Sequence, residues 1–424
     1  MILAVNTSFP EMNQLAAGLA EAGLLSTYVR PYANFQRKWE RNLESMPWLG
    51  KVYSHTFGRR VLPQPLTKKN VRETGVILDF LMSAHGRLPS TTPDYRRIRR
   101  ALMDARTNAV AKTAAKVFSG EPAVVASWGC AEYLFRTAKT TGSICVLNYP
   151  LAHHRFTRRF LLEEAERQPD FADTLNSLDL KPWFEQRLDT EIELADYILV
   201  GSSFARDSFI AEGIPPEKLV VIPYGADLQL FEPIETPRAH NQKLRLLFVG
   251  QVTQRKGLSY LLQAMQQLGI NNYTLTIVGQ MQGSARILNP HRYLFQQIPH
   301  VPQTELRELY RQADIFVFPT LVEGMGLVVL EAMASGLPVI TTPNGPGDIV
   351  RDGIDGFLIP PRNVSAIVDR VEYLRAHQNL RFEMGQNARS RALQFTLESY
   401  RGHVVKLLRS WIGVEEENEY DIRS

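Results

Sequence analysis

The feature that most constrains the fold of this 424-residue chain is the alternation of short apolar runs with amphipathic stretches. Near-continuous runs of Val, Ile and Leu that end in turn residues are typical of strands buried on both faces of a parallel sheet. Amphipathic stretches such as 259–269 and 304–313 indicate helices that cover such a sheet. The pattern therefore predicts a doubly wound α/β architecture. The expected strands are residues 1–6, 123–128, 143–149, 196–203, 218–225, 244–250, 273–279, 313–320 and 337–342.

One segment interrupts this alternation. Residues 231–243, FEPIETPRAHNQK, contain two prolines and mixed charge without apolar periodicity, and a new apolar run begins directly after them. We therefore predict two Rossmann-like domains, residues 1–237 and 238–424, since the chain is long enough for two cores. Residues 31–118 are basic and irregular, and are expected to decorate the first domain. Ligands of open α/β sheets bind outside the carboxyl ends of the strands, so a cleft between the halves is the expected active site.

Composition excludes several classes of protein. With 44% hydrophobic and 22% charged residues, the chain is of the ordinary globular kind. Cys130 and Cys145 are its only cysteines, so neither a disulfide framework nor a thiol-cluster zinc site is expected. No run of about 18 apolar residues occurs, and MILAVNTSFP resembles a first strand more than a secretion signal. The expected location is the reducing cytoplasm.

Residues 51–100 carry a local excess of positive charge. Such an excess indicates either a solvated basic face or an anionic neighbour, and these alternatives stay open. The anionic neighbours considered are lipid headgroups, which imply peripheral attachment at the inner face of a membrane, and a diphosphate-bearing acceptor. Nucleic acid is disfavoured, because no binding motif accompanies the charges. The basic residues are Lys51, Arg59, Arg60, Lys68, Lys69, Arg72, Arg87, Arg96, Arg97, Arg99 and Arg100, against the acids Glu73, Asp79 and Asp94.

The stretch 321–342, LVEGMGLVVLEAMASGLPVITT, predicts a glycine turn after a strand, followed by a helix from residue 327 to Gly336. A strand, a glycine turn and a helix N-terminus together form an anion site, because free N–H groups point toward the ligand. Glu323 lies in the turn and Glu331 on the helix. Carboxylates accept hydrogen bonds from vicinal hydroxyls, so this pair either binds a sugar and a ribose or consists of a helix cap and a surface acid.

A second turn of this kind occurs near the start of the same domain. Residues 247–265, LFVGQVTQRKGLSYLLQAM, predict a strand, a turn that carries Arg255, Lys256 and Gly257, and another helix. A basic pair in that position could bind a diphosphate across the glycine turn. Taken singly, the two cations are more typical of a solvated loop, but two complementary turns in one domain favour a ligand site.

These blocks resemble family 4 glycosyltransferases, which are retaining enzymes of the GT-B fold with two Rossmann-like domains. The resemblance depends on the Glu-x7-Glu element from Glu323 to Glu331 and on VGQVTQRKGLSYLLQA at 249–264, with agreeing blocks at 193–204, 218–231 and 313–319. It covers roughly residues 190–375. It implies that the C-terminal domain binds a nucleotide-sugar donor, that the N-terminal domain binds the acceptor, and that the C-terminal helix returns to the N-terminal domain.

The resemblance also implies a role for each site residue. Arg255 and Lys256 would neutralise the diphosphate beside Gly250, Glu331 would bind the ribose, and Glu323 would lie at the donor sugar. The amides of the glycine turn would reach the phosphate or sugar; they belong to Gly324, Met325, Gly326 and Leu327. No Asp-x-Asp pair occurs, so no cofactor and no essential metal are expected. The chain departs from the family pattern at Gln251, where many members have Arg, and at Asn-Gly-Pro-Gly-Asp, 344–348.

A histidine pair follows an expected strand of the first half. SICVLNYPLAHHRF, 143–156, places His153 and His154 past the carboxyl end of that strand, where either structural or ligand-binding histidines occur. The resemblance implies that a histidine there contacts the donor sugar and helps to position the acceptor, and His153 is the predicted one. The acidic run Glu163, Glu164 and Glu166 is expected to be a solvated helix face.

The leading hypothesis is a retaining transferase that moves a hexosyl group from a UDP- or GDP-sugar to a glycan or glycolipid acceptor in polysaccharide or glycoconjugate biosynthesis. Alternatives within the fold are a nucleotide-sugar epimerase and a glycoside phosphorylase, and a further one is a non-catalytic nucleotide-sugar sensor. An NAD-dependent dehydrogenase is disfavoured, since neither half shows G-x-G-x-x-G after its first strand. The sequence leaves the donor base, the sugar and the acceptor open.

Overall fold

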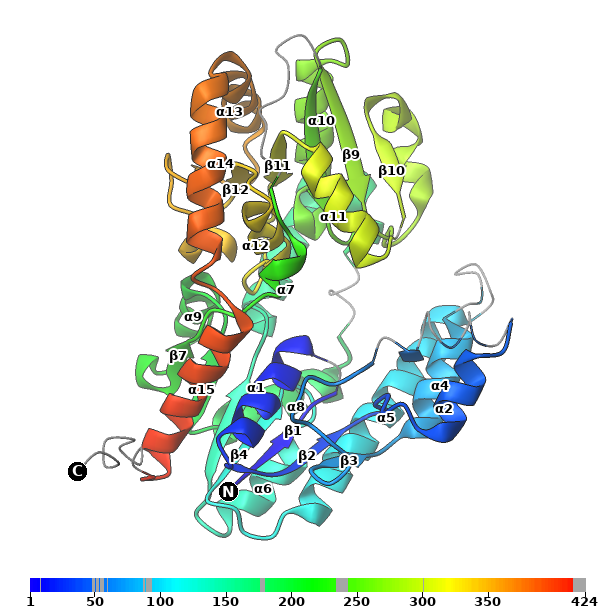
Figure 1. Cartoon of the computed structure of the whole chain (residues 1–424), viewed down its shortest axis with the longest axis vertical. Helices are drawn as coiled ribbons and strands as arrows, with labels where there is room; N and C mark the ends of the chain where they lie inside the picture. Colours follow the sequence, from blue (N-terminus) through cyan, green and yellow to red (C-terminus); the bar gives the residue numbers. More distant parts are fainter. Residues whose placement is uncertain are drawn as a thin grey trace, which may run out of the picture. The chain divides into compact units, whose positions relative to one another are not determined.

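The computed structural model describes residues 1–424 except 8, 48–49, 51–52, 54–56, 59, 87, 89–93, 176–179, 234–242, 300 and 415–424. Most of the predicted linker 231–243 lies outside the described residues, as do Lys51, Arg59 and Arg87 of the basic segment. The described residues form two parallel β-sheets with helices packed on them (Figure 1). This architecture confirms the predicted doubly wound α/β class.

The first sheet has the strand order β3-β2-β1-β4-β5-β6-β7. Its neighbours pair in parallel, for example Val5 beside Ala126, and its central strands are fully buried. The order changes direction between β1 and β4, which makes that position the switch point of the sheet. The strands are β1 (Ile2–Val5), β2 (Leu25–Arg30), β3 (Val71–Glu73), β4 (Ala123–Ser127), β5 (Ile144–Asn148), β6 (Tyr197–Val200) and β7 (Leu219–Val221).

The second sheet repeats the same topology, with the order β10-β9-β8-β11-β12-β13. All of its pairs are parallel, and its switch point lies between β8 and β11. Every strand expected from the apolar runs is present in one sheet or the other. The strands are β8 (Leu244–Val249), β9 (Tyr273–Val278), β10 (Gln296–Ile298), β11 (Ile315–Phe318), β12 (Val339–Thr341) and β13 (Gly356–Leu358).

Helices follow most of these strands and pack with one another, as α5 does with α6, α10 with α13 and α12 with α14. The first half contains α1 (Pro10–Glu21), α2 (Lys38–Glu44), α4 (Val76–His85), α5 (Tyr95–Val117), α6 (Glu132–Lys139), α7 (His154–Arg167), α8 (Pro182–Leu194) and α9 (Ser203–Ile210). The second contains α10 (Leu258–Leu268), α11 (Gln303–Gln312), α12 (Leu327–Ala334), α13 (Val364–Ala376), α14 (Gln378–Ala392) and α15 (Leu397–Trp411). Short 3₁₀ helices are η2 (Pro169–Thr174), η4 (Pro216–Lys218), η5 (Leu228–Leu230), η6 (Gln254–Lys256), η7 (Ala285–Leu294) and η8 (Pro346–Asp348).

The chain divides into two compact units that are not continuous in sequence. The first unit comprises Met1–Tyr149, Pro182–Leu199 and Tyr400–Ser424, and the second comprises Pro150–Lys181 and Val200–Ser399. The segment that carries α7 and η2 therefore packs with the second sheet although it follows β5 of the first. The domain boundary near residue 238 stays a prediction. Each compact unit of the structure is assembled from several segments of the chain.

The C-terminal helix α15 completes the first unit. Arg401 Nε donates to Gln14 Oε1 at 2.9 Å, and the ring of Trp411 stacks on Tyr197 with centroids 3.8 Å apart. This packing confirms the expected return of the C-terminal helix to the N-terminal domain.

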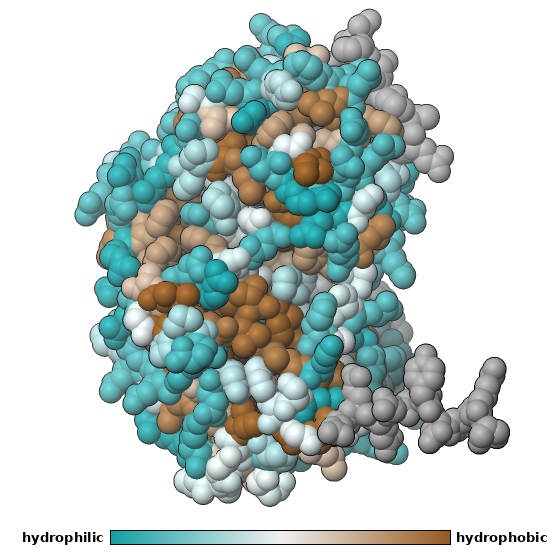
Figure 2. Space-filling model, turned by 90° about the vertical axis from the view of Figure 1, so that its left-hand side faces the viewer, coloured by the Kyte–Doolittle hydropathy of each residue, from teal (hydrophilic) through white to brown (hydrophobic). Residues whose placement is uncertain are grey.

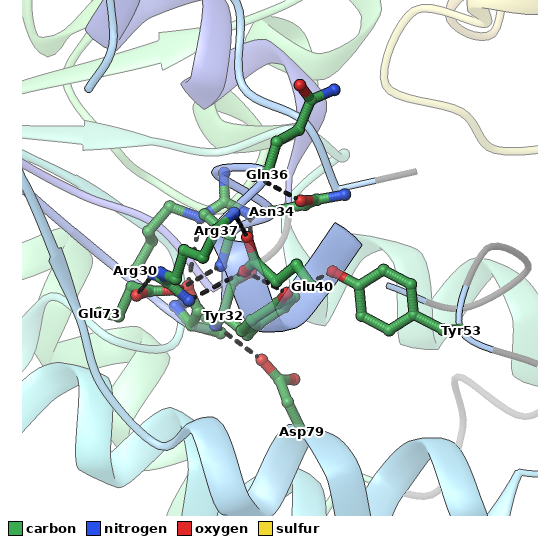
Figure 3. Close-up of polar contacts among 11 residues, drawn as sticks. Arg30, Tyr32, Asn34, Gln36, Arg37, Glu40, Tyr53, Glu73 and Asp79 are labelled. Atoms are coloured by element: carbon green, nitrogen blue, oxygen red, sulfur yellow. Dashed lines mark hydrogen bonds and ion pairs between the residues drawn. The ribbon is translucent and has the colours of Figure 1, made fainter. Parts of the chain in front are cut away.

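A buried polar network fixes the chain between β2 and α4 in the first unit. The Tyr32 hydroxyl donates to Glu40 at 2.6 Å and lies 2.7 Å from the Tyr53 hydroxyl. Asp79, on α4, accepts the Tyr32 N–H at 2.9 Å and pairs with Arg106 at 2.8 Å. Figure 3 shows Tyr32, from the segment after β2, with Glu40 of α2, Asp79 of α4 and Tyr53 around it. Both carboxylates are buried and multiply hydrogen-bonded, as buried charges must be.

Hydrophilic residues predominate on the face of the molecule that Figure 2 shows, and apolar residues gather there in a few patches. Among the residues that the structure describes, no helix is long and apolar enough to cross a membrane.

Candidate functional site

Three turns follow neighbouring strands at the carboxyl edge of the second sheet. They are residues 250–257 after β8, 319–326 after β11 and 342–348 after β12. Because β8 and β11 flank the switch point, the connections after them leave toward opposite sides and open a crevice between the first two turns. Both turns that were singled out from the sequence therefore end at one crevice of the second unit.

The turn after β8 is shaped by two glycines with positive φ. Gly250 has φ 145°, and Gly257, with φ 74°, is the N-cap of α10. A Cβ on Gly257 would collide with the carbonyl oxygen of Pro319, so the two turns can approach this closely only at a glycine. The Leu321 N–H donates to the Arg255 carbonyl at 2.9 Å and fastens the turns together.

This close approach brings the predicted cations to the predicted acid. Arg255 Nη1 donates to the Val322 carbonyl at 2.8 Å and lies 3.3 Å from Glu323 Oε2. Lys256 Nζ forms an ion pair with the same carboxylate oxygen. The three side chains are 20%, 9% and 12% exposed, respectively. Arg255, Lys256 and Glu323 therefore form one partly desolvated cluster with an excess positive charge.

The electrostatics of this cluster suit an anionic ligand. Burial lowers the pKa of Arg255 to about 10, which still leaves the guanidinium charged at neutral pH. Burial, and then the neighbouring Arg255 charge, lower the pKa of Lys256, whereas the contact with the Glu323 carboxylate opposes that effect. An incoming diphosphate would supply negative charge at the point where two cations are balanced by a single carboxylate.

The glycine turn before α12 has the geometry of an anion site. Gly326, with φ 84°, is the N-cap of α12, and the first N–H groups of a helix have no intrahelical partner. Gly324 leaves room for the Pro150 carbonyl, which any Cβ there would overlap. The Met325 sulfur accepts the Tyr224 N–H at 2.9 Å, so that side chain is packed inward, and Leu327 is half-buried. The roles of the turn amides in binding stay predictions.

Glu331 lies on α12, as expected from the sequence. The Tyr310 hydroxyl donates to Glu331 Oε2 at 2.9 Å, and burial raises the pKa of the carboxyl to about 7 although this hydrogen bond lowers it. The residue is half-buried. Its second oxygen and its remaining lone pairs give it the capacity to bind hydroxyl groups.

The turn after β12 supports the Glu323 turn directly. Gly345 has φ 122° and lies against the Glu323 Cβ, and Asn344 Nδ2 donates to the Leu321 carbonyl at 2.7 Å. The Ser202 hydroxyl donates to the Gly324 carbonyl. From the sequence, residues 344–348 stood out only as a departure from the family pattern, and Ser202 was not identified. Glycine and asparagine after a strand were the available signal for the first, whereas no local signal marks the second.

His153 is buried at the start of α7. Its Nδ1 accepts the Arg155 N–H at 3.2 Å as an N-cap, and its ring stacks on His154 with centroids 4.5 Å apart. Burial, followed by the charge of His154, lowers the pKa of His153 to about 3, so its ring is neutral at physiological pH. A neutral imidazole can donate or accept a hydrogen bond but supplies no charge. The catalytic role of His153 stays a prediction.

A pocket of ≈ 210 Å³ opens beside the β8 turn. Gln251, which stands where the family pattern has Arg, lines it, so this position does border the site. Sequence reasoning did not single out the wall contributed by the segment after β5. The lining residues are Leu151, Thr157, Thr174, Gln251, Thr253, Arg255, Gln282 and Val322.

The prediction that residues 163–166 form a solvated face is wrong for Glu164. Glu164 is fully buried, and Arg362 Nε donates to its Oε2 at 2.7 Å. A helix on the surface of the first domain would expose this side chain, but α7 packs on the second unit and turns it inward.

Within the described part of the chain, no group of three or more His, Cys, Asp or Glu side chains could hold a metal ion. The absence of an essential metal stays a prediction, since it concerns the reaction and the donor complex.

Comparison with known proteins agrees with this geometry. Residues 232–391 match the family model described as Glycosyl transferases group 1. D-inositol 3-phosphate glycosyltransferase of Paenarthrobacter aurescens is 30% identical over 254 residues, which are 53% of this chain and 61% of that protein. The UDP-Gal:alpha-D-GlcNAc-diphosphoundecaprenol alpha-1,3-galactosyltransferase of Escherichia coli is 27% identical over 173 residues, 37% of this chain and 45% of that protein. The chain thus spans less than two thirds of the length of these curated relatives.

Solved structures match the whole fold at low sequence identity. Sucrose-phosphate synthase from Thermosynechococcus elongatus gives a TM-score of 0.63 at 18% identity, covering 98% of this chain and 99% of that one. Anabaena Alr3699/HepE in complex with UDP and glucose gives 0.62 at 14% identity, covering 96% and 99%. These likenesses confirm the predicted GT-B fold.

Proposed function

We propose that the protein is a retaining glycosyltransferase of family 4 that moves a hexosyl group from a UDP- or GDP-sugar to a glycan or lipid-linked acceptor in polysaccharide or glycoconjugate biosynthesis. The observation that carries the proposal is the cluster of Arg255, Lys256 and Glu323 at the switch point of the second sheet. The matched region of glycosyl transferases group 1 contains all three residues, and two named relatives are glycosyltransferases.

The chemistry of such a transfer fits the charge of the cluster. The leaving group is a nucleoside diphosphate, so the transition state develops negative charge on its phosphate oxygens. Arg255 and Lys256 are preorganised in a poorly hydrated crevice, where cations stabilise such charge strongly without reorganising. On binding, the diphosphate would take over the cations that Glu323 now holds, which would free Glu323 to orient the sugar hydroxyls.

The remaining roles follow from position. Glu331 would accept hydrogen bonds from the ribose hydroxyls, and the amides from Gly324 to Leu327 would contact the phosphate or sugar beside Gly250. His153 would act as a neutral hydrogen-bonding group between the donor sugar and the acceptor. Nothing in this scheme requires a covalent nucleophile or a metal, since the cations and helix amides supply the positive charge.

The proposal is tested with Lys256→Ala and Glu323→Ala, assayed for donor-dependent transfer. Lys256→Ala is expected to lose roughly 100-fold or more in kcat, the effect of removing one preorganised charge-stabilising group, and Glu323→Ala a comparable factor, because the donor sugar is no longer oriented. Lys243→Ala is the matched control: this lysine bonds the Ile270 carbonyl at the opposite edge of the sheet and should leave the rate unchanged. Unchanged transfer in both site variants would contradict the assignment of the site.

A thermal-shift screen against nucleoside diphosphates and their sugars identifies the donor, because a ligand that binds the folded state raises its stability, and a tighter ligand at the same concentration raises it more. Product analysis without acceptor then separates the alternatives. An epimerised donor indicates the epimerase, and binding without turnover of any acceptor indicates the sensor.

We further propose that the basic segment, residues 51–100, attaches the protein to the inner face of an anionic membrane. Ile77 and Leu81 project from one face of α4 at 76% and 49% exposure. Arg97 and Arg99, on the first turns of α5, are also exposed, and α4 packs against α5. Exposed apolar side chains beside exposed cations are the features that bind interfacial helices to anionic lipid.

Vesicle flotation tests this attachment. Binding should require anionic lipid, should weaken as salt rises from 0.05 to 0.5 M in the assay, and should fall in Ile77→Ser/Leu81→Ser. Ile270→Ser, another exposed isoleucine, is the control and should float as the wild type does. Flotation that is indifferent to lipid charge and salt would contradict the attachment.

A further inference from the structure

Helix α7 and the following η2 make several polar contacts with the turn that carries Arg255 and Lys256. On α7, the buried Glu164 carboxylate accepts two hydrogen bonds at Oε1: from Gln254 Nε2 at 2.7 Å and from the Tyr260 hydroxyl at 2.8 Å. Its Oε2 accepts from Arg362 Nε at 2.7 Å. A buried carboxylate with partners on both oxygens is held in a single orientation.

Gln254 transmits this orientation to the turn. It precedes Arg255, is fully buried, and uses both ends of its side chain. Its Oε1 accepts the Ser259 N–H at 2.9 Å, and its Nε2 donates to Ser259 Oγ at 2.7 Å as well as to Glu164. The residue before the two cations is thus fixed between α7 on one side and the first turn of α10 on the other.

Two further hydrogen bonds, both to Thr174, hold the same turn. The Gln254 N–H donates to Thr174 Oγ1 at 2.8 Å, and the Thr253 hydroxyl donates to the Thr174 carbonyl at 2.7 Å. Thr174 ends η2 and also lines the pocket beside Arg255. Two independent contacts from α7 and η2 therefore hold the backbone of the turn at the residues directly before the cations.

We propose that Glu164 is a positioning residue of the donor site, which holds the Thr253–Lys256 turn through Gln254 so that Arg255 and Lys256 are aligned on a nucleoside diphosphate. The inference rests on the proposed function, since it concerns how Arg255 and Lys256 are held in place to bind the diphosphate. Glu164 acts through other residues and does not itself touch the ligand. Thr174 has the same role through the backbone.

The expected consequence is specific to the phosphates. Misalignment of two cations weakens the binding of a diphosphate, but it leaves contacts with the base and ribose intact. Removal of one partner from a buried hydrogen-bonded carboxylate network has an effect on the order of tenfold in an equilibrium constant. Glu164→Gln keeps the size of the side chain and replaces one accepting oxygen by an amide that cannot accept from its donors.

The experiment compares the full-length wild type with Glu164→Gln and Glu163→Gln by calorimetric titration with UDP, GDP, uridine and guanosine. Glu163 is the matched control: it neighbours Glu164 on α7, its side chain is 48% exposed, and it also pairs with Arg362. Glu164→Gln should weaken the binding of the preferred diphosphate roughly tenfold and change the nucleoside dissociation constant less than twofold. Glu163→Gln should change neither.

Thr174→Val provides a second route if Glu164→Gln folds poorly. Valine keeps the shape of threonine and removes the oxygen that accepts the Gln254 N–H and donates to the Phe171 carbonyl, so it should lower the affinity for the diphosphate in the same selective way. Equal losses for nucleoside and diphosphate in both variants would show a general structural role and would overturn the positioning role. Unchanged diphosphate binding in both would overturn it as well.

Binding by the wild type separates a failure of the proposed function from a failure of the positioning role. If it binds neither UDP nor GDP, the proposed function fails and the inference falls with it. If it binds a diphosphate and both variants match it, the positioning role alone is wrong.

Discussion

Two carboxyl groups, one in each unit, have the same raised pKa but differ in how many hydrogen bonds they accept from the protein. Burial raises the pKa of both Glu191 and Glu331 to about 7. Glu191 accepts the N–H groups of Gly129 and Ala131 at 2.6 and 2.7 Å, so it fills the N-terminal end of α6 with the protein's own carboxylate. Glu331 accepts only the Tyr310 hydroxyl among its described contacts. The N-terminal end of α6 is therefore occupied by the protein's own carboxylate, whereas the carboxyl group of Glu331 retains capacity to accept further hydrogen bonds.

The raised pKa of Glu331 predicts a pH dependence of stability. Between about pH 4.5 and pH 7 the folded protein keeps a proton on Glu331 that the unfolded chain has lost, so this group lowers the free energy of unfolding as pH rises through that window. Glu331→Gln lacks this contribution. Its stability relative to the wild type should increase by up to about 3 kcal/mol from pH 4.5 to pH 8.

Urea unfolding of the wild type and Glu331→Gln at several pH values measures the difference. Two stability curves that stay parallel across the window would show that Glu331 titrates normally in the folded protein.

At the scale of elements, the site depends on glycines that let turns touch. Gly257 and Gly269 begin and end the same helix, α10, and both have φ near 70°. Only Gly257 lies against another turn, at the Pro319 carbonyl, while no atom lies within 4 Å of the Cβ position of Gly269. The first glycine therefore fixes the distance between the β8 and β11 turns, and the second only ends a helix.

This contrast predicts unequal costs for two matched substitutions. Gly269→Ala should lower the free energy of unfolding by about 1–3 kcal/mol, the cost for alanine of the φ 72°, ψ 167° conformation that glycine adopts readily. Gly257→Ala should cost about 3 kcal/mol or more, because the collision with Pro319 adds to the strain of its own left-handed conformation. It should also weaken nucleoside diphosphate binding, which Gly269→Ala should not.

Chemical denaturation and titration of both variants measure these effects. Unchanged nucleoside diphosphate binding in Gly257→Ala would mean that the Pro319 turn moves away without consequence, and that its approach does not define the site.

At the scale of the molecule, each compact unit is built from segments that are far apart in the sequence. The chain leaves the first sheet after β5 and contributes Pro150–Lys181 to the second unit, and its last helix returns to the first unit. At two places, therefore, a segment belongs to a different compact unit from the one that its position in the sequence suggests. One of them contributes a wall of the candidate pocket, and the other covers α1 and β6.

Trp411→Ala tests the return of α15. Loss of the stacked ring should weaken the docking of α15 by about 1–2 kcal/mol and should raise amide hydrogen exchange in β6 and α15. Strands β8 and β11 of the second unit serve as the internal control and should keep their protection. A uniform rise across both sheets would mean that α15 supports the whole molecule rather than the first unit.

Much of the fold and part of the site could be predicted from local sequence. Apolar runs that are buried on both faces identify parallel strands, and glycine turns before helices identify Arg255, Lys256, Glu323 and Glu331, because these signals depend only on neighbouring residues. The edge strands β3, β10 and β13 were missed. Val-Arg-Glu in β3 and Gln-Gln-Ile in β10 contain no apolar run, and Gly-Phe-Leu in β13 was not singled out.

Contacts between groups distant in the sequence could not be predicted, because they depend on tertiary packing. Glu164 belongs to an acidic run that suggests a solvated face, yet it is buried against Gln254, 90 residues later in the chain. Ser202 and Gly324 are likewise separated by 122 residues. Such contacts depend on how the chain crosses between compact units, which no local periodicity encodes. Local sequence is sufficient to predict the two sheets and the chemical groups at their edges, whereas tertiary packing selects the residues that hold those groups in place.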